Sequence, residues 1–126
     1  LTIKGDVIVA VACCPDNGRV FLLGWNLYWF DPDPNGQNQL TMIPIPYMGA
    51  YAKFVFTYRS SVLLIYNRST LLAVQTKGTP AVSANPINIG TTVINLVPRD
   101  ETHFFVNDFS IGTNGGKISL FQLSYI

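Results

Sequence analysis

Charged side chains are scarce in this sequence. Asp, Glu, Lys and Arg make up 12% of the 126 residues, which is about half the share of an ordinary soluble domain. The net charge is +1, and the eight Lys and Arg residues form no cluster that could neutralise a run of phosphates. The sequence therefore argues against a nucleic acid partner. Its low charge also leaves little repulsion to oppose self-association.

Long apolar runs and helical periodicity are missing as well. The longest apolar stretches, at residues 7–14 and 62–66, are far shorter than the roughly 20 residues that a membrane helix needs. We therefore expect no membrane span. No window of about a dozen residues keeps apolar positions at helical spacing without an interruption by Gly, Pro or a β-branched run. Strands rather than helices are expected.

Cysteine and histidine are nearly absent, which removes most routes to catalysis. The two cysteines, Cys13 and Cys14, are adjacent. Strand neighbours point to opposite faces, so a bridge between them would be strained. We expect one core thiol and one facing solvent or a partner, with a vicinal disulfide or a metal-binding thiol pair as alternatives. His103, the single histidine, would need a nucleophile or a carboxylate beside it to act as a general base, and the nearby Asp100 and Glu101 are expected on the turn before its strand. We assign no catalytic residues and predict that the chain is not an enzyme.

Short stretches rich in Val, Ile, Phe, Tyr and Thr recur along the chain, each bounded by Gly, Pro, Asn or Asp. They predict an all-β fold. Hairpin turns are expected at residues 16–18, 59–61 and 99–101, where turn-forming residues separate apolar runs. About ten short antiparallel strands are predicted, near residues 6–13, 18–24, 27–31, 39–44, 51–58, 61–66, 70–76, 92–97, 102–107 and 117–124.

The strands fall into three similar units of roughly 40 residues. The units begin with the apolar stretches at residues 7–14, 52–58 and 93–97, and each continues into two further strands. This repeat predicts three propeller-like blades, with a β-sandwich or jelly roll as the alternative. Closed propellers need at least about four blades. Residues 1–126 would thus form a single all-β domain that pairs with a second copy or belongs to a larger chain or assembly.

One segment also resembles a known family. Residues 18–26 pass through a hydrophobic strand to Gly24, and residues 27–32 continue into an aromatic–Asp–Pro turn. The pattern within residues 18–38 resembles the middle of a kelch-type β-propeller blade. It departs from that pattern at Trp25, which replaces the second Gly, and no Trp closes the blade. The resemblance implies a scaffold that recognises proteins or carbohydrates through loops at one end of its blades.

The same segment carries the candidate ligand or interface residues. On a strand, Tyr28 and Trp29 face opposite sides, so one aromatic face packs in the core and the other is free. An exposed ring beside an amide and a carboxylate is typical of sugar-binding sites, and Trp and Tyr also anchor protein interfaces. Further aromatic candidates are Tyr47, Tyr51, Tyr58 and Tyr66. The selected candidates are Trp25, Asn26, Tyr28, Trp29 and Asp31.

The end of this segment resembles the opening of a calcium loop. Asp31, Asp33 and Asn35 place oxygens at alternating positions before Gly36, which allows a tight backbone reversal. A complete loop would have Glu six residues beyond the Gly, where this chain has Met42. An exposed turn between strands is the alternative, and no other cofactor is expected.

These patterns predict a non-enzymatic structural or interaction β-domain that acts through protein–protein contacts. We expect a homo-oligomer or a larger assembly, of virion or filament type, in an extracellular or virion-associated location. The alternative is a carbohydrate-binding, lectin-like module that uses the aromatic candidates.

Overall fold

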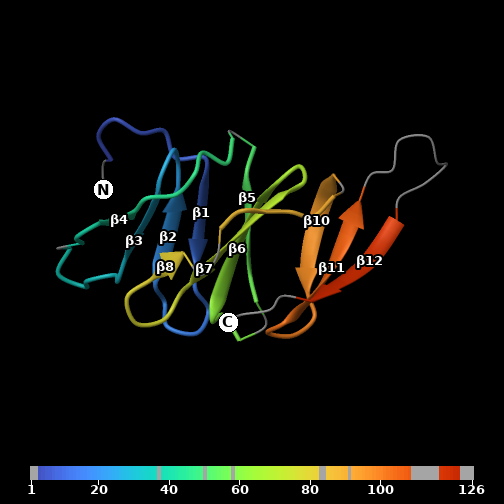
Figure 1. The fold of residues 1–126 in the computed structure, drawn as a ribbon. Helices are drawn as coiled ribbons and strands as arrows, with labels where there is room; N and C mark the ends of the chain where they lie inside the picture. The colour runs from blue at the N-terminus through green and yellow to red at the C-terminus, as the bar shows by residue number, and fades with distance from the viewer. Residues whose placement is uncertain are drawn as a thin grey trace.

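A computed structural model describes residues 3–36, 38–49, 51–57, 59–82, 85–90, 92–108 and 117–122. In these residues, twelve short strands form three antiparallel sheets (Figure 1). The fold class is all-β, as predicted. Each predicted strand corresponds to an observed one, although the observed strands are mostly shorter. Within the described part of the chain, no helix is long and apolar enough to cross a membrane.

The first sheet has four strands in the order of the chain, each paired antiparallel with the next. A tight turn joins the first two strands. In it Gly18 adopts a positive φ of 73° and donates its backbone N–H to the Cys14 carbonyl, a backbone conformation that favours glycine. The strands are β1 (Ala10–Cys13), β2 (Val20–Leu23), β3 (Leu27–Phe30) and β4 (Thr41–Ile43).

The middle sheet has five strands, and its centre is the hairpin of β6 and β7. Two very short strands, β8 and β9, both pair with β7. The sequence pattern did not predict these two, because two residues are too few to show an alternation. The strands are β5 (Lys53–Phe56), β6 (Val62–Asn67), β7 (Thr70–Gln75), β8 (Ala81–Val82) and β9 (Ile87–Asn88).

The third sheet has three strands in chain order. The pairing register shifts between Val93 and Asn95 of its first strand, as it does at a β-bulge. The strands are β10 (Val93–Pro98), β11 (His103–Asp108) and β12 (Lys117–Gln122). The predicted ends of two strands, at residues 58 and 123–124, lie outside the described residues.

The middle sheet is buried on both faces, and two hydrophobic cores result. Alternate residues of β6 point to opposite sides: Leu63 and Ile65 join the core shared with the first sheet, and Leu64 joins the core shared with the third. β7 alternates in the same way. Three sheets thus stack side by side around two cores (Figure 1), whereas the alternative β-sandwich would enclose one core between two sheets.

The three sheets repeat in one orientation. Their first strands are neighbours, since β5 contacts both β1 and β10. The first hairpin turns of the sheets also lie together: the Cys14 thiol reaches the Ser60 carbonyl, and Ser61 reaches Glu101. These turns are the three that the sequence predicted. The three sheets also agree with the three predicted units.

The adjacent cysteines separate as expected for strand neighbours. Cys14 is fully buried in the first core, Cys13 is exposed, and both are free thiols. The prediction of one core thiol and one outward thiol is therefore confirmed.

Candidate functional site

The five candidate residues lie along one hairpin, but the structure does not bring them into one site. Trp25 and Asn26 form the turn between β2 and β3, whereas Asp31 follows the far end of β3. Tyr28 and Trp29 point to opposite faces of the sheet, because their β2 partners are Leu22 and the core residue Phe21. Two separate regions result, one at each end of the hairpin.

The turn end is organised by Asp6, which sequence reasoning did not select. Its carboxylate accepts hydrogen bonds from the Trp25 backbone N–H at 2.9 Å, the Asn26 N–H at 3.4 Å and the Tyr28 hydroxyl at 2.7 Å. Partial burial raises the pKa of Asp6, but these hydrogen bonds outweigh it and hold the pKa below its ordinary value. A Cβ on Gly24 would collide with this carboxylate. The turn is therefore fixed by a charged acceptor.

An aromatic cleft opens beside this turn. The exposed side chains of Trp25 and Tyr47, with 67% and 64% of their surface accessible, meet edge to face with ring centroids 6.0 Å apart. Together with Asn26 and Ile45 they line a cleft of about 410 Å³. Tyr47 lies in the connection from β4 to β5, so no local sequence pattern pairs it with Trp25. We call these four residues the aromatic cleft.

The other end of the hairpin is a structural clamp. The Arg19 guanidinium binds both carboxylate oxygens of Asp31, at 2.8 and 3.1 Å, and lies 4.3 Å above the Trp29 ring. It also donates to the carbonyls of Thr76 and Gly78, at 2.9 and 2.7 Å. These contacts join the first sheet to the turn after β7. The Arg19 hydrogen bond keeps the pKa of Asp31 below its ordinary value.

Two candidates are therefore used inside the fold. The Asp31 carboxylate pairs with the Arg19 guanidinium, while 61% of the Asp31 side chain stays exposed. The Trp29 ring packs against the first core. Its indole N–H is buried and has no hydrogen-bond partner in the described part of the chain, at a cost of about 1–3 kcal/mol.

The residues of the predicted calcium loop form a turn. The Asp33 carboxylate accepts the Asn35 backbone N–H at 2.9 Å, and the Asn38 side chain accepts the Asp33 N–H at 2.8 Å. The described residues contain no group of three His, Cys, Asp or Glu side chains that could share a metal ion. With Asp31 bound by Arg19, the geometry gives no support to a calcium site here.

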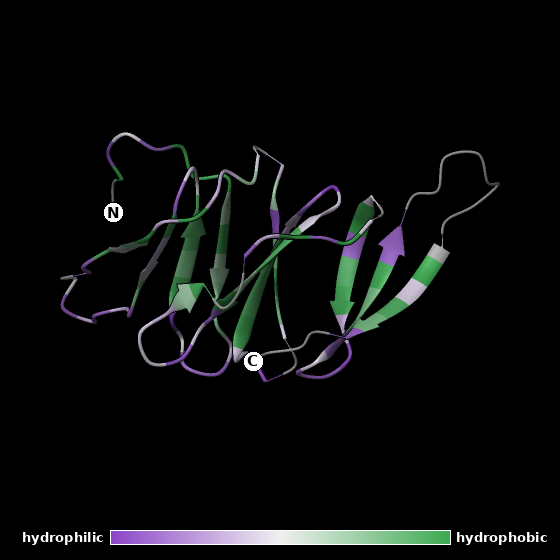
Figure 2. Cartoon of the chain, in the orientation of Figure 1, coloured by the Kyte–Doolittle hydropathy of each residue, from purple (hydrophilic) through white to green (hydrophobic). Residues whose placement is uncertain are grey.

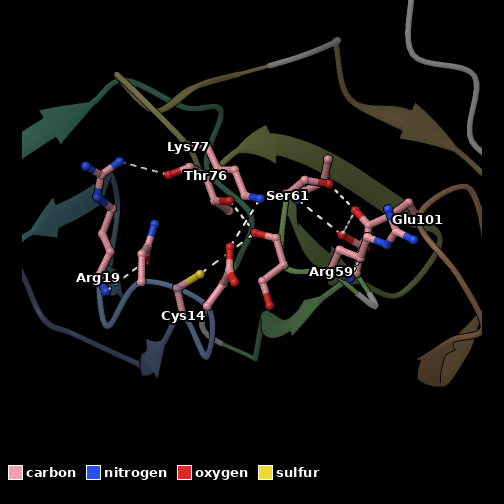
Figure 3. Close-up of polar contacts among 12 residues, drawn as sticks. Cys14, Arg19, Arg59, Ser61, Thr76, Lys77 and Glu101 are labelled. Atoms are coloured by element: carbon pink, nitrogen blue, oxygen red, sulfur yellow. Dashed lines mark hydrogen bonds and ion pairs between the residues drawn. The ribbon is translucent and has the colours of Figure 1, made fainter.

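A row of polar contacts joins the turn ends of all three sheets (Figure 3). The Ser60 carbonyl accepts from the Cys14 thiol at 3.8 Å and from the Thr76 hydroxyl. Glu101, in the turn before β11, accepts from the Ser61 hydroxyl and from the Thr57 hydroxyl at 2.8 Å. Burial raises the pKa of Glu101, but the hydrogen bonds that its carboxylate accepts have a larger, opposite effect, and its pKa lies below the ordinary value. This polar seam fixes the orientation of the sheets.

The single histidine belongs to the last of these turns. The Nδ1 atom of His103 lies 2.9 Å from the Asp100 carboxylate and 2.9 Å from the Thr102 hydroxyl. Hydrogen bonds from the Thr102 amide and from His103 keep the pKa of Asp100 well below its usual range. Both partners meet the same ring nitrogen, whereas an acid–base relay uses the two nitrogens for different partners.

The end sheets present apolar outer faces. The register of β1 to β4 puts seven uncharged strand residues on the side of the first sheet away from the core. Val11 is 63% exposed there. We call this side the first outer face. Its residues are Val11, Cys13, Val20, Leu22, Tyr28, Phe30 and Met42.

The third sheet has a similar side, which we call the third outer face. The register of β10 to β12 places its large apolar residues in line across the sheet, and Ile118 is 71% exposed. No Asp, Glu, Lys or Arg lies among the described strand residues of either outer face. Figure 2 shows hydrophobic residues on the strands of the end sheets as well as in the middle. The apolar residues of the third outer face are Val97, Phe105, Ile118 and Leu120.

Comparison of the chain with protein-family models, with curated proteins and with solved structures found no match to any of them.

Proposed function

We propose that this chain is a non-enzymatic structural module that packs its two outer faces against further β-sheets in a protein assembly. The observation that carries the proposal is the contrast between sheets. Both apolar faces of the middle sheet are covered by its neighbours, whereas the described residues cover only one face of the first sheet and one face of the third.

The composition of the outer faces supports this function. Exposed apolar residues are ordinary when scattered singly, but continuous apolar patches mark interaction sites. Val11, Leu22, Tyr28 and Met42 are direct cross-strand neighbours and run across all four strands of the first sheet. Val97, Phe105 and Leu120 cross the third sheet in the same way. When two sheets pack face to face, rows of apolar side chains like these are buried between them.

The repeated orientation of the sheets favours a propeller-like assembly. First strands cluster together and first turns share one polar seam, as expected for blades arranged around an axis. The kelch resemblance of residues 18–38 fits this architecture and remains part of the proposal. The low charge of the chain suits a subunit of an extracellular or virion assembly.

A hydrophobic dye tests whether the outer faces are exposed apolar surfaces that can bind a partner. We expect the chain either to self-associate or, as a monomer, to bind 8-anilinonaphthalene-1-sulfonate, and we expect a variant with Val11→Lys and Leu120→Lys to do neither. Ile87→Lys, at an exposed apolar position of the middle sheet, is the control and should behave as the parent. A parent chain that stays monomeric and binds no dye would rule out the proposal.

A second candidate function is carbohydrate binding at the aromatic cleft. Two exposed rings beside an amide can stack on the apolar face of a sugar and hydrogen bond to its hydroxyls. The fixed turn reduces the entropy cost of ordering Trp25. Asp31 and Trp29 lie at the other end of the hairpin, so this version of the lectin-like hypothesis uses Trp25, Asn26 and Tyr47 in their place.

A glycan array, probed with and without calcium, tests this second function. Binding should be lost in Trp25→Ala and retained in Tyr51→Ala, which removes an exposed ring outside the cleft. Absence of binding in both conditions would reject carbohydrate recognition. Glycan binding that requires calcium would instead support the predicted calcium site at Asp31, Asp33 and Asn35.

A further inference from the structure

We propose that the partner of each outer face is a second copy of this chain, joined head to tail, so that two copies close a ring of six sheets. The first outer face of one copy packs on the third outer face of the other, and the reverse contact completes the ring. This inference rests on the proposed function and identifies the partner that covers the two outer faces.

The head-to-tail arrangement follows from the direction of the stack. Each sheet in the chain has one side toward the preceding sheet and one toward the following sheet, and the middle sheet has both sides filled. Among the described residues, no sheet covers the outer side of the first sheet or of the third. Because first strands and first turns repeat in the same orientation, continuing the stack places a third sheet before a first sheet.

Continuity with the existing interfaces also predicts which strands meet. Within the chain, the first strand of each sheet contacts the first strand of the next, as β1 does with β5 and β5 with β10. The same rule brings β10 of one copy against β1 of the other. Val97 on β10 and Val11 on β1 belong to the outer faces and are 50% and 63% exposed. They are the residues expected to lie closest across the contact.

The number of copies follows from closure. Propellers contain about four to eight blades, and each copy contributes three sheets. For copies of this 126-residue chain with three sheets each, two is the whole number that falls within this range. The resulting dimer has twofold symmetry and two equivalent interfaces. Because the described strand residues of both faces include no Asp, Glu, Lys or Arg, no like-charge pair of strand residues opposes the contact.

Native mass spectrometry and light scattering of the purified chain test the inference. We expect twice the 13.9 kDa mass of one chain. Val11→Lys and Val97→Glu should each shift the protein to the monomer mass, because either change puts an unpaired charge into an apolar contact. Circular dichroism of each variant verifies that it is folded, and Ile87→Lys is the control that should remain dimeric.

Mixing the two variants distinguishes head-to-tail packing from contacts between like faces. In a mixed dimer, the lysine introduced in one copy meets the glutamate introduced in the other at one interface, and the second interface is unaltered. The equimolar mixture should therefore regain the dimer mass. A mixture of folded variants that stays monomeric, or a dimer disrupted by only one of the two substitutions, would contradict head-to-tail packing. If the parent chain is a monomer that binds the dye, the partner of the outer faces is not a second copy of this chain. The proposed function would still hold in that case.

Discussion

At the scale of single residues, Arg19 connects the first sheet to the turn that follows β7. It pairs with Asp31, lies over Trp29 and donates to two carbonyls of the turn after β7. The partners are distant in sequence, at positions that no local pattern relates. The sequence singled out Asp31 as a candidate ligand residue but could not reveal its ion pair with Arg19, the residue directly before β2.

Replacing Arg19 tests the strength of this clamp. We expect Arg19→Met to lower the free energy of unfolding by about 2 kcal/mol, because hydrogen bonds from a charged donor to two carbonyls are lost. Chemical denaturation monitored by circular dichroism measures the change. Lys77→Met removes the exposed ion pair with Asp16 and should cost at most about 0.5 kcal/mol. Equal effects of the two substitutions would contradict the clamp.

Asp6 makes the aromatic cleft sensitive to acid. Its pKa in the folded protein lies below the ordinary value of 3.8, so its contribution to stability is present above that value and is lost as the pH falls toward the folded pKa. Fluorescence of Trp25 should therefore change below about pH 4. Asp6→Asn should show the altered fluorescence already at neutral pH. An acid transition that is unchanged in Asp6→Asn would assign the effect to another group.

The pattern of residue types could not reveal which aromatic rings are exposed. Alternation along β3 separates Tyr28 from Trp29, but it does not say which side is the core. The answer depends on the middle sheet, which covers the Trp29 side. Trp25 is exposed because it lies in a turn held by Asp6, a contact between residues 19 positions apart.

At the scale of elements, the strands were predictable and their ends less so. Apolar runs bounded by turn residues located ten strands, because each was long enough to show its pattern. β8 and β9 have two residues each and are defined only by pairing with β7. Their existence depends on tertiary structure and not on local preference.

The β6–β7 turn holds a conformational strain that substitution can relieve. Arg68 adopts a positive φ of 53°, which costs a residue with a side chain about 1–2 kcal/mol. Arg68→Gly should therefore raise the free energy of unfolding by about 0.5 kcal/mol, after the greater entropy of glycine in the unfolded chain is subtracted. Thermal denaturation measures the gain.

Arg59→Gly provides the matched control for this prediction. Arg59 also lies in a hairpin turn, but it is not among the described residues with positive φ. Glycine there should lower stability, because only the entropy cost remains. A loss of stability in both variants would show that Arg68 makes contacts that outweigh its backbone strain.

At the scale of the whole molecule, the sequence indicated three units but not how they pack. The repeat in the sequence agrees with the three sheets, because each sheet is built from consecutive strands. The stacking order depends on side chains that only the fold brings together, such as Ser61 and Glu101 in the polar seam. The number of units led to the prediction that two outer faces need a partner, which stays a prediction.

Hydrogen exchange should reveal the central position of the middle sheet. Backbone amides of β6 and β7 should exchange slowest, because both strands are covered on two faces and opening them disrupts both cores. Amides of β4 and β12, at sheet edges, should exchange early. Exchange followed by mass spectrometry on peptides measures the order. Equal protection of all three sheets would indicate a single cooperative unit that opens only globally.

The construction of each sheet from consecutive strands also affects synthesis on the ribosome. Contacts between neighbours in sequence form quickly, so the first sheet can pair its strands before the rest of the chain has been translated. Its inner side, with Phe21, Leu23 and Leu27, then stays uncovered until β6 and β7 emerge. During that interval the nascent chain exposes an adhesive apolar surface, the kind of transient surface that chaperones protect.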